Sequence, residues 1–113
     1  MEYNVDDRQN AVVLALEGNI LGGPDGTRLH DTLRQLKEQG KKNVVVDLSK
    51  AAFMSSSGLG MLISAMTTMR NAGGDVRLAS SPDKIQQLIR LTKLDSVFQQ
   101  YSNVDEAVVS YTT

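Results

Sequence analysis

The run Val44-Val45-Val46, which leads into Asp47 and Leu48, constrains the fold more than any other part of the sequence. Three consecutive β-branched residues favour a strand, and the lack of an alternating polar residue predicts that both of its faces are buried. Strands of this kind are typical of parallel sheets covered by helices, because helical crossovers connect each strand to the next. The run therefore predicts an α/β protein with this strand at the centre of its sheet.

The rest of the sequence supplies the alternating strands and helices that such a sheet requires. Short apolar or alternating patterns predict further strands at residues 1–8, 11–16, 76–79 and 97–98, with a turn at 7–10 between the first two. Apolar residues at helical spacing predict three helices, at Leu29, Leu33 and Leu36; at Leu59, Leu62, Ile63, Met66 and Met69; and at Ile85, Leu88 and Ile89. A terminal helix is expected to run through Val108 and Tyr111. The order β-β-α-β-α-β-α-β-α indicates a single α/β domain over residues 1–113. Its sheet is expected to be mixed and mostly parallel, with about five strands and four helices.

Local signals indicate where these helices begin and end. Pro24 is expected at the first position of the first helix, where a missing N–H costs nothing, and Gly40 at its left-handed C-terminal cap. Ser81-Pro82 predicts a serine N-cap followed by proline at the start of the third helix. Asn103, with Glu106 three residues later, resembles a capping box that opens the last helix.

Composition and charge exclude several classes of function. The 113 residues suffice for one domain with its own core, and the absence of cysteine excludes disulfides and thiolate metal sites. Twelve Lys and Arg against 13 Asp and Glu give a net charge of −1, which predicts no direct binding to nucleic acid. The N-terminus has no signal-peptide pattern, and no apolar run approaches the roughly 20 residues that span a bilayer. We therefore expect a cytoplasmic domain without a membrane segment.

No pattern of catalytic residues points to an enzyme. The single histidine, His30, lies beside the apolar positions of the first helix and has no G-x-S-x-G serine to partner it. The segment 81–84 fits the S-x-x-K pattern of penicillin-recognising enzymes, but the companion S-D-N and K-T-G patterns are missing. Gly58-Leu59-Gly60 is half of a dinucleotide-binding fingerprint, and Ile63 stands where its third glycine belongs. We expect no catalytic residue, no metal and no cofactor.

Three serines, Ser55, Ser56 and Ser57, separate the central strand from the second helix. One of them is expected to cap the helix by accepting a hydrogen bond from a free N–H group. Gly58 and Gly60 each cost about 1 kcal/mol of helix propensity relative to alanine, which indicates a close approach to the backbone here. A phosphate is also favoured at a helix N-terminus, so one serine is a candidate for phosphorylation while its neighbour caps the helix.

The segment V-V-V-D-L-S-x-x-x-F-M-x-S-S-G-L-G-x-L, residues 44–62, resembles the signature of the STAS domain family, named after sulfate transporters and anti-sigma-factor antagonists. The length of the chain and its predicted order of elements also agree with that family. The chain is more similar to the stand-alone bacterial antagonists than to the tail of an anion transporter, because no membrane segment accompanies it.

The resemblance implies a role in partner switching. In this family the unphosphorylated domain binds an anti-sigma factor that is also a serine kinase, and this binding releases the sigma factor. The kinase then phosphorylates a serine in a D-S-[ST]-G segment, which ends the interaction, and a serine phosphatase resets it. On this sequence the motif places the acceptor at Ser56, with Ser57 and Ser55 as alternatives. It implies a partner-binding surface that comprises Ser55, Ser57, Gly58, Leu59 and Met61.

Two departures from the family pattern remove negative charge from the expected recognition face. Ser55 stands where the acceptor motif usually has aspartate, and Leu21 replaces the aspartate of a G-E-L-D segment at Gly18-Asn19-Ile20-Leu21. One alternative is a constitutive STAS-type interaction or scaffold domain without a phosphorylation switch. Another is a small nucleotide- or anion-binding domain that uses the helix start at residues 56–60. In each case we expect a monomer or a weak dimer.

Overall fold

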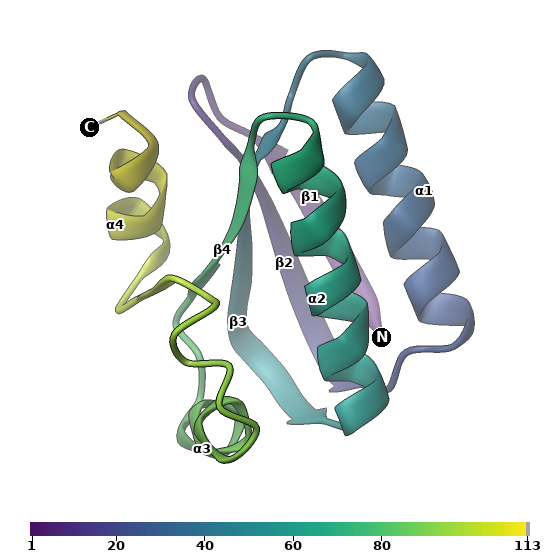
Figure 1. The fold of residues 1–113 in the computed structure, drawn as a ribbon, viewed down its shortest axis with the longest axis vertical. Coiled ribbons are helices and arrows are strands. Elements are labelled where there is room, and N and C mark those ends of the chain that lie inside the picture. Colours follow the sequence, from purple (N-terminus) through teal and green to yellow (C-terminus); the bar gives the residue numbers. More distant parts are fainter. Residues whose placement is uncertain (113) are drawn as a thin grey trace.

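The fold is described from a computed structural model, which covers residues 1–112 (Figure 1). The strands are β1 (Glu2–Asp7), β2 (Val12–Ile20), β3 (Asn43–Met54), β4 (Asp75–Ala79) and β5 (Gln100–Tyr101). The helices are α1 (Pro24–Glu38), α2 (Ser56–Asn71), α3 (Asp83–Leu91) and α4 (Val104–Val109), and the short 3₁₀ helix η1 (Ser110–Thr112) follows. The predicted order of strands and helices is confirmed.

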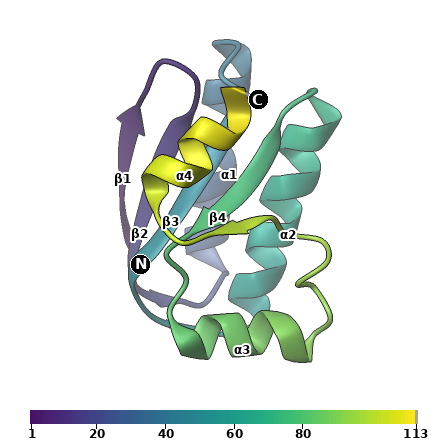
Figure 2. The ribbon, with the colours of Figure 1, turned by 90° about the vertical axis from the view of Figure 1, so that its left-hand side faces the viewer.

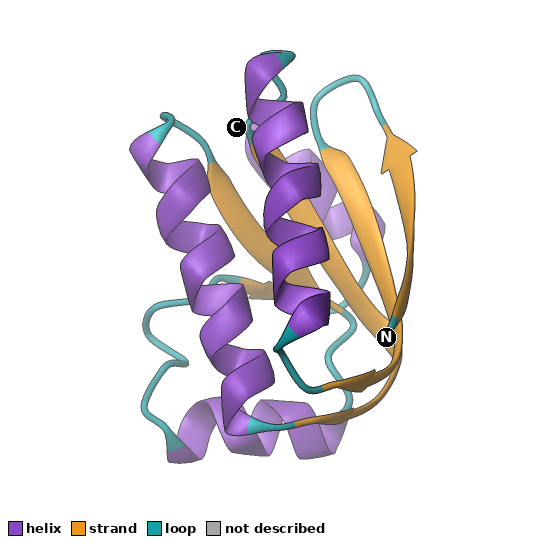
Figure 3. Cartoon of the chain, turned by 90° about the vertical axis from the view of Figure 1, so that its right-hand side faces the viewer, coloured by secondary structure: helices purple, strands orange, loops and turns teal. Residues whose placement is uncertain are grey.

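The five strands form one mixed sheet in the order β1-β2-β3-β4-β5. β1 pairs with β2 in antiparallel fashion, and every other neighbouring pair is parallel. Right-handed crossovers that advance in one direction across a sheet place their helices on the same face. α1 and α2 accordingly lie side by side on one face, while α4 packs on the other and α3 lies at one end (Figures 1 and 3). In the view of Figure 2, α4 crosses that second face.

The core has two parts, one on each face of the sheet. The larger part lies beneath α1 and α2 and contains the inward residues of β2, β3 and β4. The smaller part, beneath α4, consists of Ala11, Val13, Val45, Ala79, Ala107 and Val108. Val44 and Val46 contribute to the first part and Val45 to the second, and all three are at most 1% exposed. The prediction of a central strand buried on both faces is therefore confirmed.

Three of the predicted helix ends are also confirmed. Pro24 is the first residue of α1. Gly40 has φ 77° and follows that helix, where its N–H donates to the Lys37 carbonyl and the Lys41 N–H donates to the Leu36 carbonyl, as in a Schellman motif. At the start of α4, the Asn103 side-chain oxygen accepts a hydrogen bond from the Glu106 N–H at 2.8 Å.

The last strand was predicted at Val97–Phe98 and lies instead at Gln100–Tyr101. Val97 and Phe98 belong to a turn after α3, in which both N–H groups donate to the Leu94 carbonyl. Phe98 is 3% exposed because this turn folds it into the core. Val97 and Phe98 are therefore apolar because the turn that contains them packs against the core, and they do not form a strand.

The predicted cap of the third helix is wrong by one residue. Pro82 is the N-cap, with φ −61° and ψ 157°, and α3 begins at Asp83. The Pro82 carbonyl accepts the first hydrogen bonds of the helix, from the N–H groups of Ile85 and Gln86. The buried Ser81 hydroxyl oxygen has no hydrogen-bond partner within residues 1–112, so this serine does not cap the helix.

Candidate functional site at the start of helix α2

The three serines lie at the edge of the sheet where the parallel strands end. Ile20 and Met54 are partners at the ends of β2 and β3, and α2 starts two residues after Met54. The loop after β2 therefore lies against the first turn of α2. Binding sites of open α/β sheets are commonly found at this edge, so position alone makes the segment a candidate site.

Ser55 is the N-cap of α2. Its backbone is extended, with φ −84° and ψ 169°, and its hydroxyl oxygen accepts a hydrogen bond from the Gly58 N–H at 3.0 Å. Its own N–H donates to the Ile20 carbonyl at 3.0 Å, which ties the start of the helix to the end of β2. Ser55 therefore stabilises the start of α2 and holds it against the end of β2.

Ser56 and Ser57 occupy the first two positions of α2, and both are exposed. The first turn of α2 contains no acidic residue. The free N–H groups and the dipole of a 16-residue helix favour negative charge at this end, and no carboxylate in the first turn opposes it. A phosphate on Ser56 would therefore be electrostatically favourable for the helix.

Gly58 is where the first turn approaches the end of β2 most closely. A Cβ atom at this position would lie 2.0 Å from the Ile20 carbonyl oxygen and 2.7 Å from its carbonyl carbon. No side chain fits there, which explains one of the two glycines. Gly60 has nothing within 4 Å of its Cβ position, and nothing in the structure requires a glycine there.

The residues expected to bind a partner divide into a surface group and a buried group. Ser55 is partly buried and Ser57 is exposed, at the surface beside Ser56. Gly58 is buried, Leu59 is 2% exposed within the core, and Met61 is 9% exposed and faces α1. Gly58 and Leu59 pack beneath the surface and are too buried to contact a partner directly.

Three exposed apolar residues belong to the loop after β2, the end of β3 and the end of α3. Leu21, Phe53 and Leu91 are 50%, 53% and 74% exposed. Phe53 and Leu91 line a hollow of about 220 Å³ between β3 and α3, together with Met54, Lys84, Ile85, Gln87 and Leu88. The Leu21 carbonyl lies 3.4 Å from the Ser55 hydroxyl. We call Ser56, Ser57, Leu21, Phe53 and Leu91 the serine surface.

One signal for this surface was present in the sequence. Leu91 lies six residues after Ile85, which places it well away from the inward-facing stripe of the third helix. An apolar residue on the outer face of a helix has no core to fill. Leu21 and Phe53 carry no such signal, because an apolar residue in a loop or at a strand end does not tell which way it points.

Among residues 1–112, no group of three His, Asp or Glu side chains is placed to hold a metal ion. No helix in that part of the chain is long and apolar enough to cross a membrane. His30 is exposed on α1 and lines a groove between α1 and α2.

The fold and the site define a small α/β domain whose sheet edge carries an exposed serine surface. The chain belongs to the STAS domain family, whose sequence profile matches residues 2–107. The anti-sigma-B factor antagonist of Bacillus subtilis is 28% identical over 101 residues, which cover 86% of this chain and 89% of that protein.

Solved structures share the fold at lower identity. The crystal structure of an anti-sigma factor antagonist from Mycobacterium paratuberculosis has a TM-score of 0.83 at 22% identity, covering 99% of this chain and 94% of that one. The Bacillus cell fate determinant SpoIIAA in its phosphorylated form has a TM-score of 0.75 at 16% identity, covering 96% and 98%. These likenesses agree with the α/β sheet and helices described above.

Proposed function

We propose that this chain is an anti-sigma factor antagonist, with Ser56 as the residue that switches it. In its unmodified form it binds an anti-sigma factor that is also a serine kinase, so that the sigma factor is released. The observation that carries the proposal is the division of tasks between adjacent serines: the Ser55 hydroxyl caps α2, and Ser56 is exposed at the first position of the helix. The family membership and the names of the relatives support the same function.

The surroundings of Ser56 give the switch its physical basis. Exposed apolar side chains such as Phe53 and Leu91 favour docking of a protein partner, because contact removes them from water. A phosphate on Ser56 would add a charge of about −1.5 to −2 to the segment that directly follows β3 and Phe53. Docking would then require the removal of water from that charge, so phosphorylation is expected to weaken binding while it stabilises the start of α2.

The serine at position 55 is compatible with this proposal. Asparagine, aspartate and serine are about equally good N-caps, so Ser55 does the capping that the aspartate of the family motif would do. What it does not supply is a negative charge beside the acceptor. We infer that the partner kinase of this chain recognises Ser56 without that carboxylate, and that kinase, phosphatase and antagonist meet in the cytoplasm.

Phosphopeptide mass spectrometry of the native protein across growth and stress conditions tests the acceptor. We expect phosphate on Ser56 in a proportion that changes with the condition. In vitro, the cognate kinase and ATP should modify wild type and Ser57→Ala but not Ser56→Ala. Ser57→Ala is the matched control, since it removes the neighbouring exposed hydroxyl and leaves the cap intact. Modification of Ser56→Ala at the wild-type rate would refute the assignment.

Partner binding is measured separately, with the kinase captured on the purified chain. Ser56→Ala should bind the kinase as wild type does, and Ser56→Asp should bind at least about tenfold more weakly, which is about 1.4 kcal/mol. Ser57→Asp adds the same charge one position along and tests whether the position of the charge matters. Equal, tight binding by wild type and Ser56→Asp would remove the switch from the proposal.

One observation favours a second function, that of a constitutive STAS-type scaffold. The acceptor segment has a serine at position 55, where the family motif usually has an aspartate. Stable capture of a partner, with unmodified Ser56 under every condition, would support the scaffold over the switch.

A further inference from the structure

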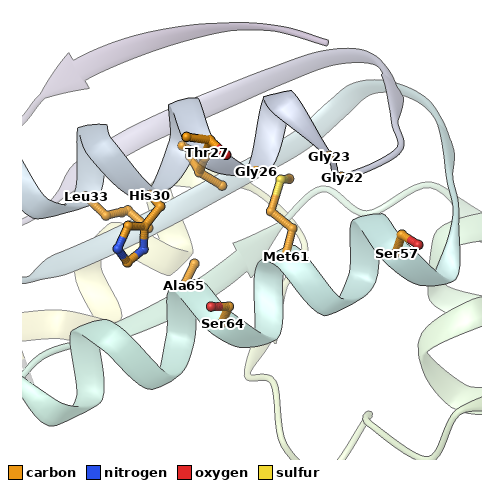
Figure 4. Close-up of a pocket in the computed structure, with 11 residues that line it drawn as sticks. Gly22, Gly23, Gly26, Thr27, His30, Leu33, Ser57, Met61, Ser64 and Ala65 are labelled. Atoms are coloured by element: carbon orange, nitrogen blue, oxygen red, sulfur yellow. The ribbon is translucent and has the colours of Figure 1, made fainter.

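α1 and α2 are separated by an open groove, which shares only Ser57 with the serine surface. Its volume is about 380 Å³, and it extends from the loop before α1, past Ser57, to the middle of both helices. Figure 4 shows Thr27 and His30 of α1 opposite Met61 and Ala65 of α2. The lining residues are Gly22, Gly23, Gly26, Thr27, Leu29, His30, Leu33, Ser57, Met61, Ser64 and Ala65.

Small residues on both walls keep this groove open. Gly26 faces Met61, and a Cβ atom at Gly26 would contact the Met61 side chain at 3.5 and 3.6 Å. Ala65 and Ser64 are small residues on the opposite wall. Two neighbouring helices normally fill the space between them with larger side chains, so the groove reflects the residue sizes on its walls.

The chemistry of the lining restricts what the groove can hold. None of the described residues that line it is Lys, Arg, Asp or Glu, so no side chain there neutralises a multiply charged ligand. Leu29, Leu33, Met61 and Ala65 form an apolar floor and are at most 9% exposed, so a ligand reaches only a small area of each. Exposed polar side chains border that floor, namely the hydroxyls of Thr27, Ser57 and Ser64 and the imidazole of His30.

We propose that the α1–α2 groove is a binding site for a small uncharged molecule with an apolar body and an amide, carbonyl or hydroxyl group. The apolar body lies on the floor, and the polar group exchanges hydrogen bonds with the hydroxyls and the imidazole. Ligand pockets span about 300 to 1,000 Å³, so this site suits a molecule at the small end of that range. The absence of cationic side chains disfavours nucleotides and inorganic anions. The inference stands apart from the switch at Ser56 and does not depend on it.

Hexanamide and hexanoate form a matched pair of probes, because they share a chain and differ in the charge of the head group. Titration into the ¹⁵N-labelled full-length chain, followed by two-dimensional NMR, should give saturable shifts with hexanamide at the amides of Gly22, Gly26, Thr27 and Ser64. Affinity in the millimolar range is expected for so small a probe. Hexanoate should bind at least about threefold more weakly, since nothing in the lining neutralises its charge.

Variants at the rim and on the wall test the location. Ser64 is exposed on α2, so Ser64→Leu fills the groove without disturbing the core and should weaken hexanamide binding at least about tenfold. Thr67→Leu makes a similar change at an exposed α2 residue outside the lining and should leave the affinity within about twofold. Gly26→Ala should weaken binding, whereas Gly60→Ala, which also adds a methyl group to a helical glycine, should not.

Three results would overturn the proposal. The first is the absence of saturable shifts in the groove with hexanamide, and the second is binding that Ser64→Leu leaves unchanged. The third is tighter binding of hexanoate than of hexanamide, which would assign the groove to an anion. If Ser64→Leu instead weakens capture of a protein partner while hexanamide shifts nothing, the groove accepts a partner side chain and the small-molecule assignment is wrong.

Discussion

Gly58→Ala tests the close approach between α2 and the end of β2. The added Cβ atom would lie 2.0 Å from the Ile20 carbonyl oxygen, at least about 1 Å inside any tolerated contact, and its two nearest neighbours are backbone atoms that cannot rotate away. Overpacking of this kind costs typically 1 to 3 kcal/mol, and we take about 3 because the backbone must move. Alanine restores about 1 kcal/mol of helix propensity. The expected net loss of unfolding free energy is about 2 kcal/mol.

Gly60→Ala is the matched control, two residues along the same helix. Its Cβ atom meets nothing within 4 Å, so only the propensity gain of about 1 kcal/mol remains. Urea unfolding measured by circular dichroism gives both free energies, and thermal unfolding should show shifts of about −8 °C for Gly58→Ala and +4 °C for Gly60→Ala. A Gly58→Ala variant as stable as wild type, or shifts of the same sign in both variants, would refute the contact.

Three further predictions concern the ends and edges of the fold. Ser55→Ala should lower the unfolding free energy by about 1 kcal/mol, and Ser55→Asp should stay within a few tenths of wild type, because aspartate caps equally well. Asp75→Asn should cost about 2 kcal/mol in urea unfolding, because the Asp75 carboxylate accepts from Arg70 at 2.8 Å and from Arg77 at 3.3 Å; a change below 0.5 kcal/mol, roughly the effect of a surface substitution, would contradict it. Burial, with the Asp75 charge nearby, raises the pKa of Tyr111, so the unfolded chain loses this proton first and stability should fall as the pH rises above about 10. Urea unfolding between about pH 9 and 11 should show a weaker pH dependence for Tyr111→Phe than for wild type; equal slopes would exclude the tyrosine as the cause.

The central architecture was predictable because local and long-range signals agree. Val44 to Val46 indicate a strand buried on both faces, and that strand does lie at the centre with helices on each side. Gly40 indicates the end of a helix for a backbone reason, since a left-handed conformation suits a residue without a side chain. Both predictions depend on only a few neighbouring residues, so they can be made from the sequence without knowledge of the tertiary structure.

The two wrong predictions, of the last strand and of the third helix cap, arise where one local pattern is compatible with two different structures. Val97 and Phe98 are apolar, but a buried turn and a short strand demand the same residue types. Ser81 precedes a proline in the manner of an N-cap, but the carbonyl that accepts the first helical hydrogen bonds is that of Pro82. In both places, contacts with the rest of the fold determine which of the two structures forms.

The site was predictable in part. The placement of Ser56 at the start of a helix followed from the strand-to-helix boundary, and a capping serine beside it was expected. Phe53 and Leu91 come together because α3 packs at the end of β3, and the α1–α2 groove depends on the sizes of residues on two helices. Such features require the relative positions of elements, which no local pattern contains.

The strand order has a consequence for how the chain folds during synthesis. Each strand pairs with the strand that precedes it along the chain, so no strand must later insert between two that have already formed. Ribosomes deliver roughly 5 to 20 residues per second, and the sheet can grow at one edge in the order of translation. α4 follows all five strands along the chain, so the apolar face around Val13 and Val45 stays open to solvent, or to a chaperone, until Ala107 and Val108 cover it.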